Sequence, residues 1–324
     1  MLYRTYKFRL YPTPEQEEIL HYHFKLCRDF YNILIENLSI IKEETGRVPS
    51  EFDTNRAIPE LKKENPELQN LYSKVLYGVV HQVYANLRGL SRLKKKGKKI
   101  GRFRLKEKWS HLTYLQQGFK LIDTGERLWL LKLGKIGEIP IRVHRPVEGT
   151  IKCVVVKQHP SGRWFANIQA EIPEQDKLPS TGREIALKIG VDYFLKDSDG
   201  RIIPHPEFYQ RTLDRIRYVQ SKLNQMEKGS EEYEYYRKRL ARLHLKIVNQ
   251  RDDFLHKLSR FYVDNYDAIR VEDVDIMWII ENSKFKMRVL DASWGKFFSM
   301  LEYKAKESGR KLILEKSETM EVVG

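Results

Sequence analysis

The sequence predicts a multidomain α+β protein, in which a β-domain split by a helical insertion is followed by an α/β domain. The first observation is length, since 324 residues are enough for about two domains at ~150 residues each. The second is that one strand pattern at the N-terminus precedes helical patterns and then further strand patterns. The third is the alternation of strands and helices beyond residue 183, which is typical of α/β domains.

The split β-domain is predicted from alternating side chains on both sides of the helices. Residues 6–10 alternate apolar and basic side chains, and Pro12 ends this strand. Four later segments show strand patterns between glycine or proline turns: 127–133, 139–143, 151–158 and 164–172. We assign residues 1–12 and 101–176 to this domain, and we expect its first strand to pair with strands beyond residue 102.

The helical insertion is assigned to residues 13–100. Thr13 suits the N-cap and Pro14 the first helical position, so a helix is expected over 14–44. Two more helices are expected, at 53–65 and 68–95. We expect the three helices to pack as a lobe apart from the β-domain.

The C-terminal α/β domain is assigned to residues 184–324, after a polar linker at 173–183. We expect a strand at 184–192, a turn at 197–200 and two helices within 206–264 that are separated at Gly229-Ser230. A second strand at 266–273, a helix at 290–307 and a third strand at 311–315 follow. This order favours a sheet with helical crossovers.

Composition limits the classes of function. The formal charge of +15 predicts a polyanionic partner, while 41% hydrophobic and 11% aromatic residues exclude a disordered chain. There is no run of 18 apolar residues and no apolar signal-peptide core, so we expect a cytoplasmic protein that does not associate with membranes. Cys27 and Cys153 are the only cysteines, which excludes a disulfide-built fold and a CxxC zinc pair.

Basic residues concentrate in one segment, residues 91–108, which holds ten Lys and Arg against a single acid. We expect a loop that leads into a strand and contacts phosphates, with Trp109, Tyr114 and Phe119 as stacking partners. A solvated loop without a partner is the alternative. The candidate nucleic-acid-binding residues are Lys94, Lys95, Lys96, Lys98, Lys99, Arg102, Arg104 and Lys106.

Two acids are candidates for a metal site. Asp192 and Glu272 each fall at the end of a predicted strand, on the face opposite its aliphatic side chains. Carboxylates that end adjacent strands can converge on Mg²⁺, as phosphodiester cleavage requires. The alternative is that each acid simply ends its strand at the solvent boundary.

Eight segments together resemble the TnpB family of insertion-sequence proteins, which are relatives of the compact type V CRISPR effectors. In order they are YKFRLYPTPEQ (6–16), CRDFYN (27–32), KKKGKKIGRFRLK (94–106), LTYLQQGFKL (112–121), YFLKDSDGRIIPHPEFY (193–209), IVNQRDDFLHKLS (247–259), YDAIRVEDVDI (266–276) and DASWGKF (291–297). They are distributed from residue 6 to residue 297, along almost the whole chain.

The resemblance implies a wedge-like β-barrel interrupted by a helical recognition lobe, then an RNase H-like RuvC nuclease domain. It implies a guide RNA from the transposon end, double-stranded target DNA and Mg²⁺-dependent DNA cleavage. Asp192 matches the first catalytic and metal-binding acid, and Glu272 the second. Arg251, His256 and Lys257 match the family's basic helix, where nucleic-acid contact is expected.

Three departures from the family pattern predict impaired cleavage. Asp192 runs directly into Tyr193-Phe194-Leu195, so the first strand is expected to lack a turn in which to reverse. Zinc-ribbon cysteines and the helix bearing the third acid are missing, so the RuvC domain is expected to be incomplete, without zinc and with a weak Mg²⁺ site. Asp273 or Glu315 could instead complete that site. The alternatives are a nuclease-dead, repressor-like nucleic-acid-binding protein and a decayed transposon remnant.

Overall fold

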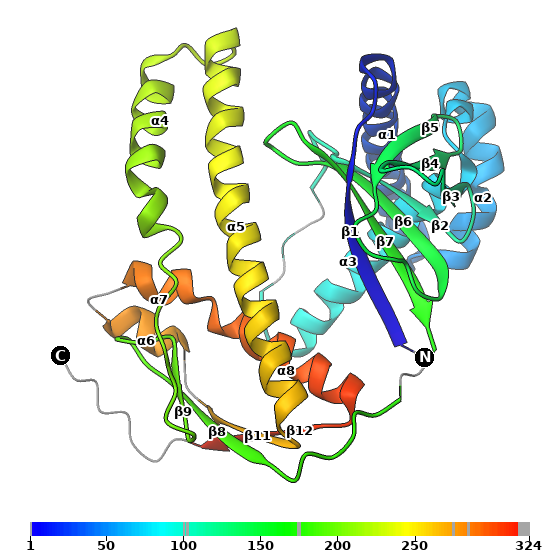
Figure 1. The fold of residues 1–324 in the computed structure, drawn as a ribbon. Helices are drawn as coiled ribbons and strands as arrows, with labels where there is room; N and C mark the ends of the chain where they lie inside the picture. The colour runs from blue at the N-terminus through cyan, green and yellow to red at the C-terminus, as the bar shows by residue number, and fades with distance from the viewer. Residues whose placement is uncertain are drawn as a thin grey trace. The chain divides into compact units, whose positions relative to one another are not determined.

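The computed structural model describes residues 2–99, 101, 104–173, 176–273, 276–283 and 286–316. The chain divides into two compact units, Met1–Pro173 and Glu174–Gly324, each built around a β-sheet with its own hydrophobic core (Figure 1). No helix in these ranges is both long enough and apolar enough to cross a membrane. The two units confirm the predicted fold class of a β-domain with inserted helices followed by an α/β domain.

The first unit contains a seven-stranded antiparallel sheet with the order β2-β6-β7-β1-β5-β4-β3. Its strands are β1 (Leu2–Leu10), β2 (His111–Leu115), β3 (Phe119–Ile122), β4 (Trp129–Leu133), β5 (Gly137–Arg142), β6 (Thr150–Gln158) and β7 (Trp164–Ile172). The edge strands β2 and β3 are joined by only residues 116–118, so the sheet is a nearly closed barrel. As predicted, β1 pairs with strands beyond residue 102, namely β7 and β5.

The inserted helices follow β1 and begin where the sequence predicts. They are α1 (Pro14–Thr45), α2 (Glu51–Glu64), the short 3₁₀ helix η1 (Pro66–Asn70) and α3 (Ser73–Lys95). Thr13 and Gln16 form a capping box at the start of α1, and Gly46 ends this helix with a φ of 70°. These local signals explain why the sequence locates α1 almost to the residue.

The inserted helices share one hydrophobic core with the barrel, so the prediction that they pack apart from it is wrong. The buried ring of Phe24 on α1 stacks on Trp164 of β7, with 5.6 Å between ring centroids. Helix α3 lies so close to β2 that a Cβ at Gly78 would fall 2.7 Å from the carbonyl oxygen of Thr113. The apolar stripes of α1 and α3 are buried on the sheet, because an amphipathic helix is stable when its apolar face packs against another apolar surface.

The second unit contains a five-stranded sheet with the order β10-β9-β8-β11-β12. Its strands are β8 (Glu184–Ile189), β9 (Leu195–Asp197), β10 (Ile202–Ile203), β11 (Ala268–Asp273) and β12 (Lys311–Lys316). Strands β8, β11 and β12 run parallel, whereas β9 and β10 form antiparallel hairpins beside β8. The predicted turn at 197–200 connects β9 to β10.

The second unit also contains helices. They are the 3₁₀ turn η2 (Gln210–Thr212), α4 (Leu213–Gln225), α5 (Glu231–Asn265), α6 (Ile276–Asn282), α7 (Lys286–Ala292) and α8 (Trp294–Ser308). Aliphatic residues of β8 and β11, among them Leu187 and Val271, share a core with Leu255 of α5 and Phe297 of α8. The predicted helix at 290–307 is divided at Ser293, whose φ of 56° separates α7 from α8.

Candidate functional site

The predicted acid pair lies at one edge of the second sheet. Strands β8 and β11 are adjacent and parallel, with Leu187 in register with Val271, so their carboxyl ends meet at the same edge. Glu272 follows Val271 directly and is half-buried. Asp192 lies three residues beyond the last residue of β8, Ile189, and is exposed. The fold thus brings both acids to one edge of the sheet, Glu272 near the end of β11 and Asp192 in the segment after β8.

The chain does reverse after β8, and the prediction of a missing turn is wrong. Strand β8 ends at Ile189 rather than at residue 192, residues 190–194 form the turn, and β9 returns with Leu195 paired to Ile189. A Cβ at Gly190 would fall 2.6 Å from the Tyr193 ring, so a larger side chain would disturb this turn. Asp192 is therefore the central residue of the turn and not the last residue of a strand.

Glu315, a suggested third acid, is engaged in an ion-pair network. It is in register with Glu272, but its carboxylate accepts a 2.9 Å hydrogen bond from Arg270, which also donates one of 3.0 Å to Glu184. These bonds raise the pKa of Arg270. The side chain of Asp273 lies outside the described residues. Within the part of the chain that is described, no group of three or more His, Cys, Asp or Glu is placed to hold a metal ion.

The acid pair fits the donor chemistry of Mg²⁺. Carboxylate oxygens are ligands that this hard cation prefers, and it commonly keeps several waters beside one or two carboxylates. Asp192 is exposed, which would leave room for such waters, and Glu272 is half-buried. Two carboxylates supply two negative charges, which is enough to neutralise one Mg²⁺ but not two.

The predicted basic residues of α5 differ in their surroundings. Arg251 donates a short charge-assisted hydrogen bond to the buried carboxylate of Asp291, which also accepts a 3.0 Å bond from the backbone N–H of Tyr209. Arg251 therefore ties α5 to α7. Lys257 is exposed and forms a 2.7 Å ion pair with Asp253. His256 is exposed as well.

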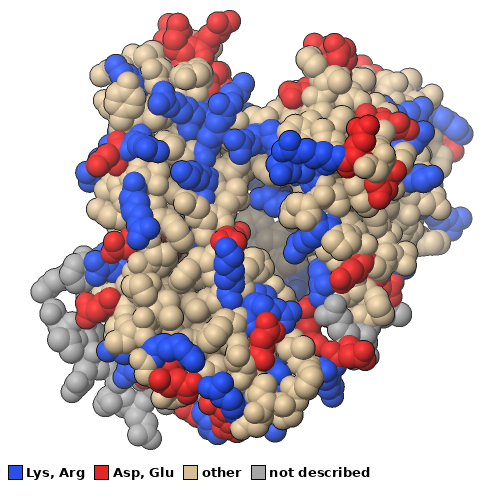
Figure 2. All heavy atoms as spheres, viewed as in Figure 1, with Lys and Arg blue, Asp and Glu red and all other residues tan. Residues whose placement is uncertain are grey.

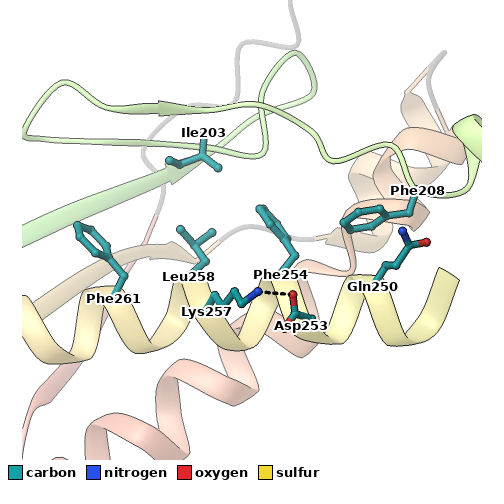
Figure 3. Close-up of a pocket in the computed structure, with 8 residues that line it drawn as sticks. All are labelled: Ile203, Phe208, Gln250, Asp253, Phe254, Lys257, Leu258 and Phe261. Carbon is teal, nitrogen blue, oxygen red and sulfur yellow. Dashed lines mark hydrogen bonds and ion pairs between the residues drawn. The ribbon is translucent and has the colours of Figure 1, made fainter. Parts of the chain in front are cut away.

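An apolar groove of about 600 Å³ runs along α5 (Figure 3). Phe254, Leu258 and Phe261 line it from the helix, and Ile203 and Phe208 line it from the segment beyond β9. The ion pair of Asp253 and Lys257 lies beside it (Figure 3). This lining offers little positive charge to a phosphate backbone.

The basic segment is partly helical, contrary to the predicted loop leading into a strand. Helix α3 continues to Lys95, and the next strand begins only at His111. The five candidate lysines in this segment are all exposed, at the end of α3 and just beyond it: Lys94, Lys95, Lys96, Lys98 and Lys99. Arg104 is exposed too, whereas Arg102 lies outside the described residues.

Lys106 and the aromatic residues behind the segment contribute to the core of the first unit. The Lys106 ammonium lies 4.3 Å from the ring centroid of Tyr31 and 4.2 Å from that of Trp109, and burial lowers its pKa. Tyr114 is fully buried and donates a 3.1 Å hydrogen bond to the carbonyl of Gly134. The prediction that Tyr114 stacks on a nucleic acid is therefore wrong.

Two basic features were not found from the sequence. One is the α4–α5 hairpin, over which lysine and arginine side chains gather in Figure 2. Its exposed basic residues include Arg215, Lys238, Arg239 and Lys246. The sequence does carry a signal for this surface, because residues 237–246 hold five Lys and Arg and no acid.

The other is a groove of about 1000 Å³ in the first unit. Its lining combines aromatic, cationic and amide side chains: Tyr3, Phe52, Tyr77, Arg56, Lys74, Lys152, Asn55, Gln116 and Gln169. The Arg56 guanidinium lies 5.8 Å from the Phe52 ring centroid, and the Phe52 side chain is 69% exposed. The groove joins residues of α2, α3 and four strands, which explains why no sequence window shows it.

Comparisons with known proteins add independent information. A family model described as a probable transposase matches residues 167–282, and one described as a helix-turn-helix domain matches residues 1–44. In this chain the latter residues form β1 and most of the single helix α1.

Two curated relatives are similar in sequence. A putative RNA-guided DNA endonuclease of Streptomyces pristinaespiralis is 30% identical over 316 residues, which cover 96% of this chain and 77% of that protein. The putative RNA-guided DNA endonuclease InsQ of Escherichia coli strain K12 is 29% identical over 160 residues, covering 49% and 39% of the two chains.

A solved structure shares the fold. The protein in a Cas12f1–sgRNA–target DNA complex superposes with a TM-score of 0.63 over 97% of this chain and 89% of that one. Sequence identity is 12%, so this likeness concerns the fold.

Proposed function

We propose that this chain binds a guide RNA derived from a transposon end and that this RNA directs it to double-stranded target DNA, which the protein cleaves weakly. The chain belongs to the TnpB family of RNA-guided DNA endonucleases, which is the premise of this proposal. The observation that carries this proposal is that the parallel strands β8 and β11 place Asp192 and Glu272 at the same edge of the second sheet, in a chain with a formal charge of +15. In RNA-guided recognition, base pairing selects the sequence while the protein holds the duplex by its backbone.

The exposed lysine and arginine side chains that do not pack into the protein interior are proposed to bind the nucleic-acid backbone. The lysines at 94–99 and the basic side chains of the α4–α5 hairpin are exposed and therefore accessible to phosphates. Each phosphate contact releases condensed counterions, which makes affinity depend on salt. Arg251 and Lys106 are better explained by their contacts within the protein.

The groove in the first unit is proposed to contact bases. Aromatic rings such as Phe52 and Tyr77 offer stacking surfaces, and the neighbouring Arg56 and Lys74 attract the phosphates. The Oδ1 atom of Asn55 is buried and has no hydrogen-bond partner among the described residues, so a base could supply the missing donor.

Cleavage is proposed to depend on Asp192 and Glu272 as ligands of Mg²⁺. When bound, Mg²⁺ would stabilise the charge that develops on the phosphate oxygens. The carboxylates position the cation, and Arg270 keeps Glu315 occupied in an ion pair. With only two carboxylates assigned to the site, we expect weak Mg²⁺ binding and little cutting. A binding protein that blocks DNA without cutting it is the second candidate, and the Arg270–Glu315 pair favours it.

The proposal is tested by isolating the 1–324 chain with its bound RNA, sequencing that RNA and measuring binding of DNA matched to it. We expect RNA-dependent DNA binding that Asp192→Ala leaves intact. Phe52→Ala should weaken DNA binding about tenfold, in keeping with ~1–3 kcal/mol for stacking on one base.

The matched control is Tyr11→Ala. Tyr11 is also an exposed ring beside an arginine, with the Arg9 guanidinium 5.5 Å from its centroid, but it does not line the groove. DNA binding that is independent of the RNA would refute guided recognition. An equal loss in both variants would remove the groove from the proposal.

A further inference from the structure

We propose that His205 and Trp294 are positioning residues, which hold the turn at 190–194 so that Asp192 faces the carboxyl edge of the sheet. This inference rests on the proposed role of Asp192 as a metal ligand. These two residues, called the anchors below, do not belong to the acid pair, and neither lies in a strand of the sheet.

His205 holds the first end of the turn. Its Nε2 lies 3.1 Å from the carbonyl oxygen of Gly190, and the residue is 9% exposed. A carbonyl only accepts hydrogen bonds, so Nε2 carries the proton and donates. Burial lowers the pKa of His205, and the hydrogen bond to the Gly190 carbonyl selects the tautomer with the proton on Nε2.

Trp294 holds the other end. Its indole N–H donates a 2.9 Å hydrogen bond to the carbonyl of Phe194, and both residues are fully buried. The backbone N–H of Phe194 in turn donates to Ile203 of β10 at 2.8 Å. The Phe194 ring meets Phe254 of α5 edge-on, with 5.1 Å between ring centroids.

Both ends of the turn are thus fixed to the protein interior, while Asp192 in its centre is exposed. The two anchors also contact each other, with 5.8 Å between the rings of His205 and Trp294. They come from PHPEF (204–208) and from DASWGKF (291–297), two stretches whose role the acid pair does not explain. Supporting the Asp192 turn gives both stretches a function.

The expected effect of losing an anchor follows from this geometry. Trp294→Phe keeps a buried ring but leaves the Phe194 carbonyl without its donor, so the turn can shift. Loss of a group that orients a metal ligand typically weakens metal binding 10- to 100-fold. We therefore expect about a tenfold weaker affinity for a divalent cation, without an equal loss of guide RNA binding.

The experiment uses Mn²⁺ as the probe and the 1–324 chain with its co-purified RNA, and it follows bound Mn²⁺ by electron paramagnetic resonance. Asp192→Ala should remove the protein-dependent site. Trp294→Phe and His205→Phe should each weaken it about tenfold, whereas His205→Gln, which restores an N–H donor, should recover most of the affinity. RNA affinity and thermal stability are measured for every variant.

The matched control is Trp164→Phe. Trp164 is 1% exposed, and its indole N–H has no hydrogen-bond partner among the described residues, so this substitution removes the same atoms without an anchoring bond. If Asp192→Ala removes Mn²⁺ binding but the anchor variants match Trp164→Phe, the anchors do not position Asp192. If wild type shows no Asp192-dependent Mn²⁺ binding, the metal-ligand role fails and the anchoring function falls with it, whereas RNA-guided DNA binding could still hold.

Discussion

The lysines at the end of α3, in the first unit, and several arginines of the second unit use their positive charge in different ways. In the first unit, the lysines around residues 94–99 project from the end of α3 and are exposed. In the second, several arginines are held by carboxylates: Arg251 by Asp291, Arg270 by Glu184 and Glu315, and Arg310 by Asp267. The comparison teaches that a count of basic residues does not locate a nucleic-acid surface, because some of these charges stabilise the fold.

The largest effect on stability is expected where a charge is buried. Arg251→Ala would leave the Asp291 carboxylate, which is 6% exposed, without its partner. Removing one member of such a pair typically costs about 3–5 kcal/mol, and partial exposure of Arg251 favours about 3. Lys257→Ala, which breaks an exposed pair on the same helix, should cost less than about 1 kcal/mol. Urea unfolding monitored for both variants checks this, and equal losses would contradict the assigned structural role of Arg251.

The exposed lysines should show the opposite behaviour. Replacing Lys94, Lys95, Lys96, Lys98 and Lys99 with Ala should leave stability nearly unchanged but lower RNA affinity for every sequence about equally. The slope of log K against log salt should flatten by up to ~0.7 for each phosphate contact removed from a single strand. RNA titrations at several salt concentrations measure it.

The control for this variant replaces Lys63 and Lys132, which are exposed lysines of the same unit paired with acids. Unchanged affinity and slope in the five-lysine variant would mean that the segment is a solvated surface, and the contrast between these lysines and the paired arginines would then disappear.

How far the sequence predicts the fold depends on whether the signal is local. The start of α1 follows from Thr13, Pro14 and Gln16, which are neighbours in the chain, and that prediction is confirmed. The predicted end of β8, at residue 192, is wrong because Val191 continues the alternating pattern in the sequence. The chain reverses from Gly190 onward, and residues distant in the sequence hold this turn.

The same distinction applies to the candidate site. Asp192 and Glu272 could be proposed from strand ends, and the structure places both at one sheet edge. The engagement of Glu315 by Arg270 and the aromatic groove could not be foreseen, because each joins side chains from several strands or helices.

The last effect concerns acid stability in the second unit, where Asp267 is also paired with the buried Arg310 side chain. Asp267 accepts hydrogen bonds from the Ser180 hydroxyl at 2.5 Å and from the N–H groups of Thr181 and Gly182 at 2.9 and 2.8 Å. These bonds hold the pKa of the Asp267 carboxyl well below its ordinary value of 3.8. Because the folded state binds this proton more weakly than the unfolded state, the stabilisation is complete above the unfolded pKa and is lost as pH falls below it.

Asp267→Asn should therefore lower stability at neutral pH and make it less sensitive to acid below about pH 4. Thermal unfolding at a series of pH values compares this variant with Asp253→Asn, which alters an exposed pair on α5. A pH dependence identical to that of wild type would show that Asp267 does not link the 180–182 segment to β11.

The central claim, RNA-guided DNA binding by a chain whose cleavage depends on Asp192 and is weak, is tested most directly by one cleavage assay. Wild type and Asp192→Ala, each loaded with the same guide RNA, are incubated with matched target DNA and Mg²⁺, and binding and cut product are measured together. The account predicts equal guided binding by both proteins, little product from wild type and none from Asp192→Ala. Robust cutting by wild type, cutting that survives in Asp192→Ala, or no guided binding by either protein would contradict it.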